Sequence, residues 1–212
     1  MSYPTYFWTS SDSRPGCVCF PEDDSPGEGQ LTSGGWSVPI LWSMCFGGED
    51  VNVLELPKDA WSLPDEPAYG ASCDAPIPGA VAQLQRRLPS LKAILTPSLH
   101  LACDMFASRM RRSQRSHVHM DVSLLLENED NPADRHWKQY WAGLLNGLDT
   151  PVARVRSGIW SKLLGLGLPP GWKYLCSWAL SNQPLHGIRA PDLDMSRVTG
   201  AVSLRHLDDW QP

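Results

Sequence analysis

The feature that most constrains this chain is a stripe of large apolar side chains between residues 137 and 148. They recur at the spacing i, i+3, i+4, i+7, i+8 and i+11, which places them on one face of an α-helix: Trp137, Tyr140, Trp141, Leu144, Leu145 and Leu148. Asn131 followed by Pro132 is typical of a helix start. Leaving such a stripe in water forfeits roughly 1.5 to 3 kcal/mol for each large side chain. The helix therefore has to pack against a sheet or other helices.

Residues 117–127 (HVHMDVSLLLE) alternate with a period of two, which predicts a β-strand. One side carries apolar residues (Val118, Met120, Val122, Leu124 and Leu126), and the other is polar (His117, His119, Asp121 and Ser123). Aromatic and β-branched residues predict a first strand at 3–9, and alternation predicts a strand at 51–56. A short strand is also expected at 198–204.

Three further helices are predicted from apolar spacing and from Pro and Gly signals. They lie at 36–46, where Gly47 and Gly48 end the helix; from 77 to near Pro89; and after Thr96, with Pro97 at the first helical position. In this last helix Leu101, Ala102, Met105 and Phe106 are expected to lie together. A helix is also expected at 151–164, whereas 172–180 fits either state.

Two segments are expected to be irregular. Residues 20–35 are acidic and rich in Gly, Pro and Ser, which predicts a mobile surface loop. Residues 57–79 carry many prolines, and we expect a long connection over the surface there.

These elements, without any internal repeat, predict a single α+β domain over residues 1–212, with a mainly antiparallel sheet packed against amphipathic helices. A chain of 212 residues with 42% hydrophobic side chains can bury a core without disulfides. The opening MSYPTYFWTSS lacks the features of a secretory signal, and no apolar run reaches eighteen residues. We therefore expect a cytoplasmic protein with reduced thiols, in which Cys45 and Cys103 are small core residues.

The charge of the chain argues against a general nucleic-acid binder. The formal net charge is −5, whereas a nucleic-acid footprint is strongly basic. Residues 1–106 carry 5 basic and 13 acidic side chains, a net charge of −8, and residues 107–212 carry 13 and 10, a net charge of +3. The acidity is thus concentrated in the first half.

The polar side of the 117–127 strand offers the best catalytic candidate, because His117, His119 and Asp121 share one strand face. The alternative is an ordinary solvated face. The same histidines with Cys17 and Cys19 would make a zinc set, but their spacing differs from that of structural zinc sites. The sequence contains no nucleophile elbow, phosphate-binding loop, zinc-protease motif or dinucleotide fingerprint, and we expect no cofactor.

Four arginines lie in and just after the last turn of the helix that begins after Thr96: Arg109, Arg111, Arg112 and Arg115. Such a run can bind phosphates or an acidic partner. Equally, it can be a solvated face that complements the helix dipole.

The order of elements over about the first ninety residues resembles a known family. The resemblance is carried by YPTYFW at 3–8, GGWSVPILWSMCF at 34–46 and SCDAPIPGAVAQLQRRLPSL at 72–91. Over these residues the chain is similar to a family of small uncharacterised bacterial proteins. Members of that family are encoded beside secreted antibacterial toxins and are interpreted as immunity proteins. The resemblance implies a non-enzymatic protein that neutralises a cognate toxin by protein–protein contact. None of its elements carries a functional residue over to this chain.

On this hypothesis acidic side chains steer a basic toxin surface and exposed tryptophans anchor the contact. The expected contact residues are Glu22, Asp23, Asp24, Glu28, Trp36, Glu49, Asp50, Asp59 and Trp61. The partner is a toxin, with no nucleic acid or membrane involved, and the chain is expected to be a monomer or weak homodimer. Two alternatives remain open: a small metal-dependent enzyme that uses the His117, His119 and Asp121 face, and a scaffolding subunit suggested by the ten tryptophans.

Overall fold

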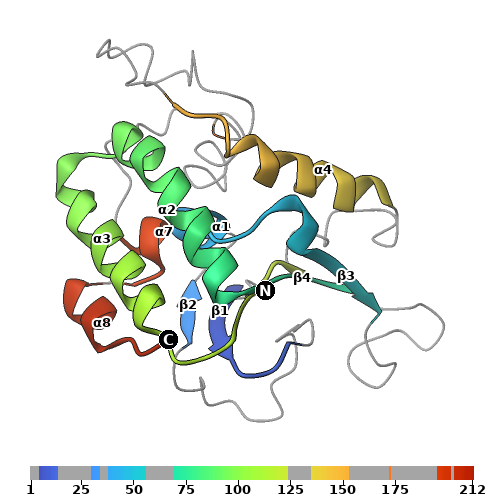
Figure 1. Cartoon of the computed structure of the whole chain (residues 1–212), viewed down its shortest axis with the longest axis horizontal. Coiled ribbons are helices and arrows are strands. Elements are labelled where there is room, and N and C mark those ends of the chain that lie inside the picture. Colours follow the sequence, from blue (N-terminus) through green and yellow to red (C-terminus); the bar gives the residue numbers. More distant parts are fainter. Residues whose placement is uncertain are drawn as a thin grey trace.

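The computed structural model contains a five-stranded antiparallel sheet with helices on one side (Figure 1). It describes residues 5–13, 30–33, 38–55, 69–123, 135–152, 172, 195–201 and 203–212. The strands lie in the order β2-β1-β5-β4-β3. Their bounds are β1 Thr5–Ser10, β2 Leu31–Ser33, β3 Val51–Glu55, β4 Tyr69–Pro76 and β5 His117–Asp121. The predicted α+β class, with an antiparallel sheet packed against helices, is confirmed.

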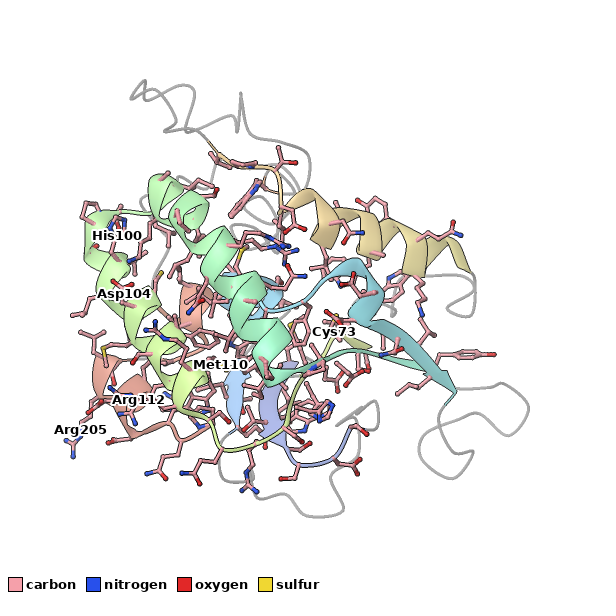
Figure 2. All side chains as sticks on the ribbon, viewed as in Figure 1. Cys73, His100, Asp104, Met110, Arg112 and Arg205 are labelled. Carbon is pink, nitrogen blue, oxygen red and sulfur yellow. The ribbon has the colours of Figure 1, made fainter. Side chains whose placement is uncertain are left out.

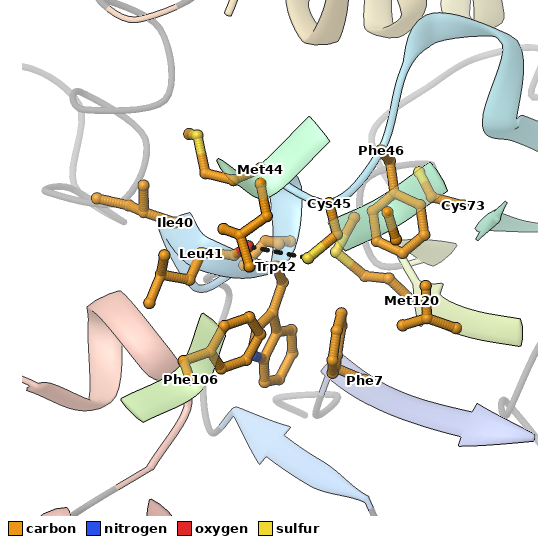
Figure 3. Packing of buried hydrophobic residues seen from close by; sticks show 14 of the residues in the cluster. Phe7, Ile40, Leu41, Trp42, Met44, Cys45, Phe46, Cys73, Phe106 and Met120 are labelled. Atoms are coloured by element: carbon orange, nitrogen blue, oxygen red, sulfur yellow. Dashed lines mark hydrogen bonds between the residues drawn. The ribbon is translucent and has the colours of Figure 1, made fainter. Parts of the chain in front are cut away.

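One face of the sheet is apolar and faces the helices. The register aligns Phe7 with Met120 and Met120 with Cys73, all with no exposed surface. Phe7 contacts rings from three separate segments: Trp42 at a centroid distance of 5.4 Å, Phe106 at 5.6 Å and Trp210 at 6.0 Å. These side chains belong to one hydrophobic cluster that runs from the first strand to the end of the chain (Figure 3).

Two long helices cover this apolar face, α2 (Ile77–Ile94) and α3 (Pro97–Arg112). In each, a proline lies at the first or second helical position, where its missing N–H costs nothing. The expected end of α2 near Pro89 is wrong, because Pro89 lies inside the helix. Burial of Ser90 and Leu91 in the following turn holds that part of the helix in place.

Two details of α3 differ from expectation. Thr96 occupies the N-cap position, but its side chain does not cap the helix and bonds to the Ser98 hydroxyl at 2.9 Å. Leu101 is 55% exposed, whereas Ala102 and Phe106 are buried. The side chains of α3 that face the core include Leu99, Ala102, Cys103 and Phe106. Leu101 lies about half a helical turn away from them, on the outer side of the helix.

The aromatic stripe forms α4 (Arg135–Gly147). Four residues of the stripe are buried, as predicted: Trp137, Trp141, Leu145 and Leu148. Tyr140, at the edge of the stripe, is 56% exposed.

The segment before β3 contains the short helix α1 (Ile40–Ser43) and the 3-10 turn η1 (Gly48–Asp50). The predicted helix over 36–46 is therefore only one turn long within the described residues, although every residue from 38 to 48 is buried. The core assignment of Cys45 and Cys103 is confirmed, because neither has exposed surface.

The chain then ends in two short helices, α7 (Met195–Thr199) and α8 (Leu204–Asp209), so the expected strand at 198–204 is wrong. Gly200 separates them with a φ of 78°, a conformation that favours glycine. The position also requires glycine for space, since a Cβ there would lie 2.3 Å from Cζ2 of Trp42. Trp42 in turn donates its indole N–H to the carbonyl of Thr199 at 3.0 Å.

Two segments expected to be irregular contain strands of this sheet. Tyr69–Pro76 is the strand β4, although it lies in the proline-rich stretch expected to be a connection. Small residues at Ala71, Ser72, Cys73 and Ala75 let it lie between β3 and β5 with little exposed surface. Leu31–Ser33 forms the edge strand β2 inside the expected loop at 20–35. Residues 20–29, 34–35 and 57–68 of these segments lie outside the described residues, as do 153–171 and 173–180, whereas 77–79 begin α2.

Candidate functional site

The expected contact residues are mostly outside the described part of the chain. This applies to Glu22, Asp23, Asp24, Glu28, Trp36, Asp59 and Trp61. The structure describes Glu49 and Asp50, which are adjacent in η1. Glu49 is exposed, whereas Asp50 is half-buried and its carboxylate accepts a hydrogen bond from the Gly47 N–H at 2.6 Å. Asp50 therefore stabilises its own turn, and of these two residues Glu49 is the one free to face a partner.

The polar side of β5 is not a solvated face. His119 is 1% exposed and Asp121 is 4% exposed, so both sides of this strand are buried. The interpretation of the histidine face as an ordinary wet strand face is wrong, because β1 and β4 flank β5 and polar side chains from both strands surround His119.

His119 is held by side chains from two neighbouring strands. Its Nδ1 lies 2.6 Å from Oδ1 of Asp74 on β4, and its Nε2 lies 2.8 Å from Oγ of Ser10 at the end of β1. The ring of Trp8 stacks on the imidazole at a centroid distance of 5.2 Å. The strand register explains the arrangement, since Trp8, His119 and Asp74 are directly opposite one another on adjacent strands.

Asp74 is the centre of the network. Besides His119 it accepts hydrogen bonds from the Ser72 hydroxyl at 2.5 Å and from the Asn52 side chain at 2.9 Å. Three donors, on β3, β4 and β5, thus converge on one buried carboxylate. The network thus joins four of the five strands, from Asn52 on β3 to Ser10 on β1.

The order Ser10, His119, Asp74 is that of a catalytic triad for acyl transfer, in which the carboxylate orients the imidazole and the imidazole accepts the serine proton. A second acceptor competes for that proton here. The Ser10 hydroxyl donates to the carbonyl of Asp12 at 2.8 Å, and the same carbonyl lies 3.2 Å from His119 Nε2. A backbone carbonyl thus lies beside Nε2 and a carboxylate beside Nδ1, so each ring nitrogen has an acceptor within hydrogen-bond distance.

The other members of the predicted constellation are placed differently. Asp121 accepts from the Ser123 N–H at 2.8 Å, and the carboxylate beside His119 belongs to Asp74 instead. His117 lies next along the strand, with its ring 6.4 Å from that of His119 and its Nδ1 2.9 Å from the Ser116 hydroxyl. Sequence reasoning missed Ser10 and Asp74 because they approach His119 from strands 109 and 45 residues away.

The described residues contain no group of three or more His, Cys, Asp or Glu side chains that could hold a metal ion. Cys17 and Cys19 lie outside these residues. Burial raises the pKa of the Cys45 and Cys73 thiols far above their ordinary value, which disfavours thiolate chemistry at both positions. Among the same residues no helix has both the length and the apolar character needed to cross a membrane.

Asp50, the last residue of η1 before β3, is close enough to Asp74 on the neighbouring strand β4 for the Asp74 carboxylate to act on its charge. Burial raises the pKa of Asp50 to about 6, and the neighbouring Glu49 and Asp74 carboxylates act in the same direction, whereas the Gly47 N–H opposes them. Asp50 therefore titrates near neutral pH at one end of this polar row.

No family model, curated protein or solved structure matches the chain in the three comparisons made.

Proposed function

We propose that this chain is a non-enzymatic immunity protein that binds and neutralises a cognate secreted bacterial toxin. The observation that carries the proposal is the pair of half-exposed rings of Tyr6 and Trp8 on β1, which lie on the polar side of the sheet, opposite the face that contacts α1, α3 and the Trp210 ring. Side chains there are fixed by mutual hydrogen bonds across four strands. Rings held on such a rigid support lose little conformational entropy when a partner binds.

Two aromatic side chains on β1 supply anchors beside this network. Tyr6 and Trp8 point to the same face by strand alternation, and both keep part of their surface exposed. Half-exposed Trp and Tyr rings on a rigid strand are typical of the residues that dominate binding energy at protein interfaces. The acidic first half of the chain further supports a partner with a basic surface, because complementary charge accelerates association.

The experiment is binding to the product of the neighbouring gene, together with rescue of cells that express it. We expect nanomolar binding, and we expect Trp8→Ala to weaken binding at least tenfold. The matched control is Tyr140→Ala, which removes an aromatic ring that is 56% exposed on α4 and should leave affinity unchanged. Absence of binding and rescue with every neighbouring gene product would refute the proposal.

A second candidate function is acyl-ester hydrolysis, favoured by the Ser10, His119 and Asp74 distances. Ser10 Oγ would attack the carbonyl carbon while His119 Nε2 takes its proton and passes it to the leaving alkoxide; water would then hydrolyse the acyl-serine by the same route. A fluorophosphonate probe tests this directly. Labelling that is lost in Ser10→Ala but kept in Ser11→Ala, with turnover of a p-nitrophenyl ester, would support hydrolysis over the immunity function. Equal labelling of wild type and Ser10→Ala would remove this candidate.

A further inference from the structure

The end of α3 faces the end of the chain across an open groove of about 940 Å³. Three arginines line it, Arg109, Arg112 and Arg115, together with the polar side chains of Ser11, Gln30 and Gln114. Arg109 and Arg112 are one helical turn apart and therefore share a face of α3. Figure 2 shows Arg112 on the side of α3 that faces α8. The groove joins the arginine run to the segment directly after Ser10, which sequence spacing alone does not bring together.

The arginines differ in how they are already paired. Arg109 forms an ion pair with Asp208 of α8 and is 26% exposed. Arg112 and Arg115 are exposed, and neither has an ion-pair partner among the described residues. Asp209 is the acidic side chain in the groove lining, and it lies 3.8 Å from the exposed Arg205. The groove thus holds more guanidinium groups than the described acidic side chains neutralise.

We propose that this groove binds an acidic polypeptide segment of a partner protein. Guanidinium forks match carboxylates with two parallel hydrogen bonds, which fits Asp and Glu side chains. The remaining lining also fits a peptide, because the amide groups of Gln30 and Gln114 and the hydroxyl of Ser11 can accept as well as donate. A peptide backbone presents both N–H and C=O groups and uses both kinds of partner.

A phosphate-rich small molecule fits the same lining less well. Phosphates need donors only, so the amide oxygens of Gln30 and Gln114 would find no partner on them. The Trp210 ring in the lining is 5% exposed and packs against Phe106, so it offers no open face on which a nucleotide base could stack. The proposal holds whether or not the partner is a toxin, so it can stand or fail independently of the proposed function.

The test uses the untagged full chain and a fluorescein-labelled peptide of twelve alternating Asp, Glu and Gly residues. Fluorescence anisotropy at low salt should detect saturable binding that weakens as salt is raised. The double variant Arg112→Gln with Arg115→Gln should lose about tenfold or more in affinity, the loss of two exposed charge-assisted contacts. Arg111→Gln with Lys138→Gln changes the net charge equally at exposed positions that do not line the groove, and should change affinity less than twofold.

Three outcomes overturn the proposal. One is an equal loss of affinity for the peptide in both double variants, which would show that the overall charge of the chain attracts it. Another is binding no tighter than that of a matched Gln and Gly peptide. The third is tighter binding of inorganic tripolyphosphate that depends on the same two arginines. A further test needs no variant: the peptide should protect Arg112 and Arg115 of the wild-type chain from modification by phenylglyoxal, as measured by mass spectrometry. Absence of protection would also contradict the proposal.

Discussion

His119 and Asp74 form a buried hydrogen-bonded pair whose contribution to stability depends on both partners being present. Their side chains are 2% and 6% exposed, so the removal of either leaves a buried polar group without its partner. Such a pair fixes which strands are neighbours and in which register, since a slip of one residue would place the His119 ring on the apolar face.

We expect Asp74→Asn to lower the free energy of unfolding by about 3 kcal/mol or more, because a buried imidazole loses its carboxylate. Urea unfolding at neutral pH measures the change. Asp104→Asn is the control, since it breaks the exposed ion pair with Lys92, and such pairs contribute about 0 to 1 kcal/mol. Similar effects of the two variants would show that the His119 network contributes no more than a surface pair.

Asp50 gives the stability of the chain a pH dependence. Its pKa is about 6 in the folded chain against an ordinary 3.8, so between these values the folded state holds more protons than the unfolded state. The contribution of Asp50 to stability is therefore greatest below about pH 4 and falls as pH rises through about 6. We expect Asp50→Asn to gain stability relative to wild type over that interval, measured by urea unfolding from pH 4 to pH 8. A constant difference between the two proteins would contradict the assignment.

At the scale of elements, Arg87 connects α2 to two segments on either side of it. Its guanidinium donates to the carbonyl of Phe46 at 2.6 Å, to that of Leu145 at 3.0 Å and to the carboxylate of Asp149 at 2.7 Å. Arg87 is 1% exposed. These bonds satisfy carbonyls at the end of α4 and after α1 that have few other donors available.

We expect Arg87→Met to destabilise the fold by about 3 to 5 kcal/mol, because buried carbonyls and the Asp149 carboxylate lose their donor together. The neighbouring Arg86 supplies a matched control. It binds the same Asp149 carboxylate at 2.7 Å, but its side chain is 56% exposed. Arg86→Met should therefore cost less than about 1 kcal/mol in the same thermal or urea melt. A cost for Arg87→Met as small as that for Arg86→Met would show that the carbonyls find water instead.

At the scale of the whole molecule, the first strand is packed against the last turn of the chain. Trp210 stacks on Phe106 at 5.2 Å and lies against Phe7 at 6.0 Å. The core cluster therefore closes only after the final described helix is in place. Folding of the sheet and folding of the chain end should consequently be one event.

We expect Trp210→Ala to lower the free energy of unfolding by about 3 to 5 kcal/mol, the usual cost of removing a large buried ring. Far-ultraviolet circular dichroism and tryptophan fluorescence should still report one coincident transition. Leu204→Ala, which truncates a side chain that is 41% exposed in the same helix, should change stability by less than about 1 kcal/mol. Separate transitions by the two probes would instead show that the chain end folds on its own.

Local pattern determined the elements whose periodicity is strong. The strand at His117, the helix carrying Trp137 and Trp141, the helix after Pro97 and the α+β class all follow from apolar spacing, which is a property of neighbouring residues. The strand β4 and the helix α7 could not be predicted from apolar spacing. Their small or mixed residues have no marked period, and their conformation is set by the strands and rings they pack against.

The candidate site was predictable only in part, for the same reason. Spacing along β5 identified His119 as chemically notable, but it assigned Asp121 as the acid and left Ser10 and Asp74 unnoticed. Hydrogen-bond partners on other strands depend on strand order and register, which a single sequence does not state. The sequence by itself therefore determined the fold class and the composition of each face. The tertiary structure alone decided which polar groups meet and which arginines share a groove, because those distances arise only when remote segments bury a common core.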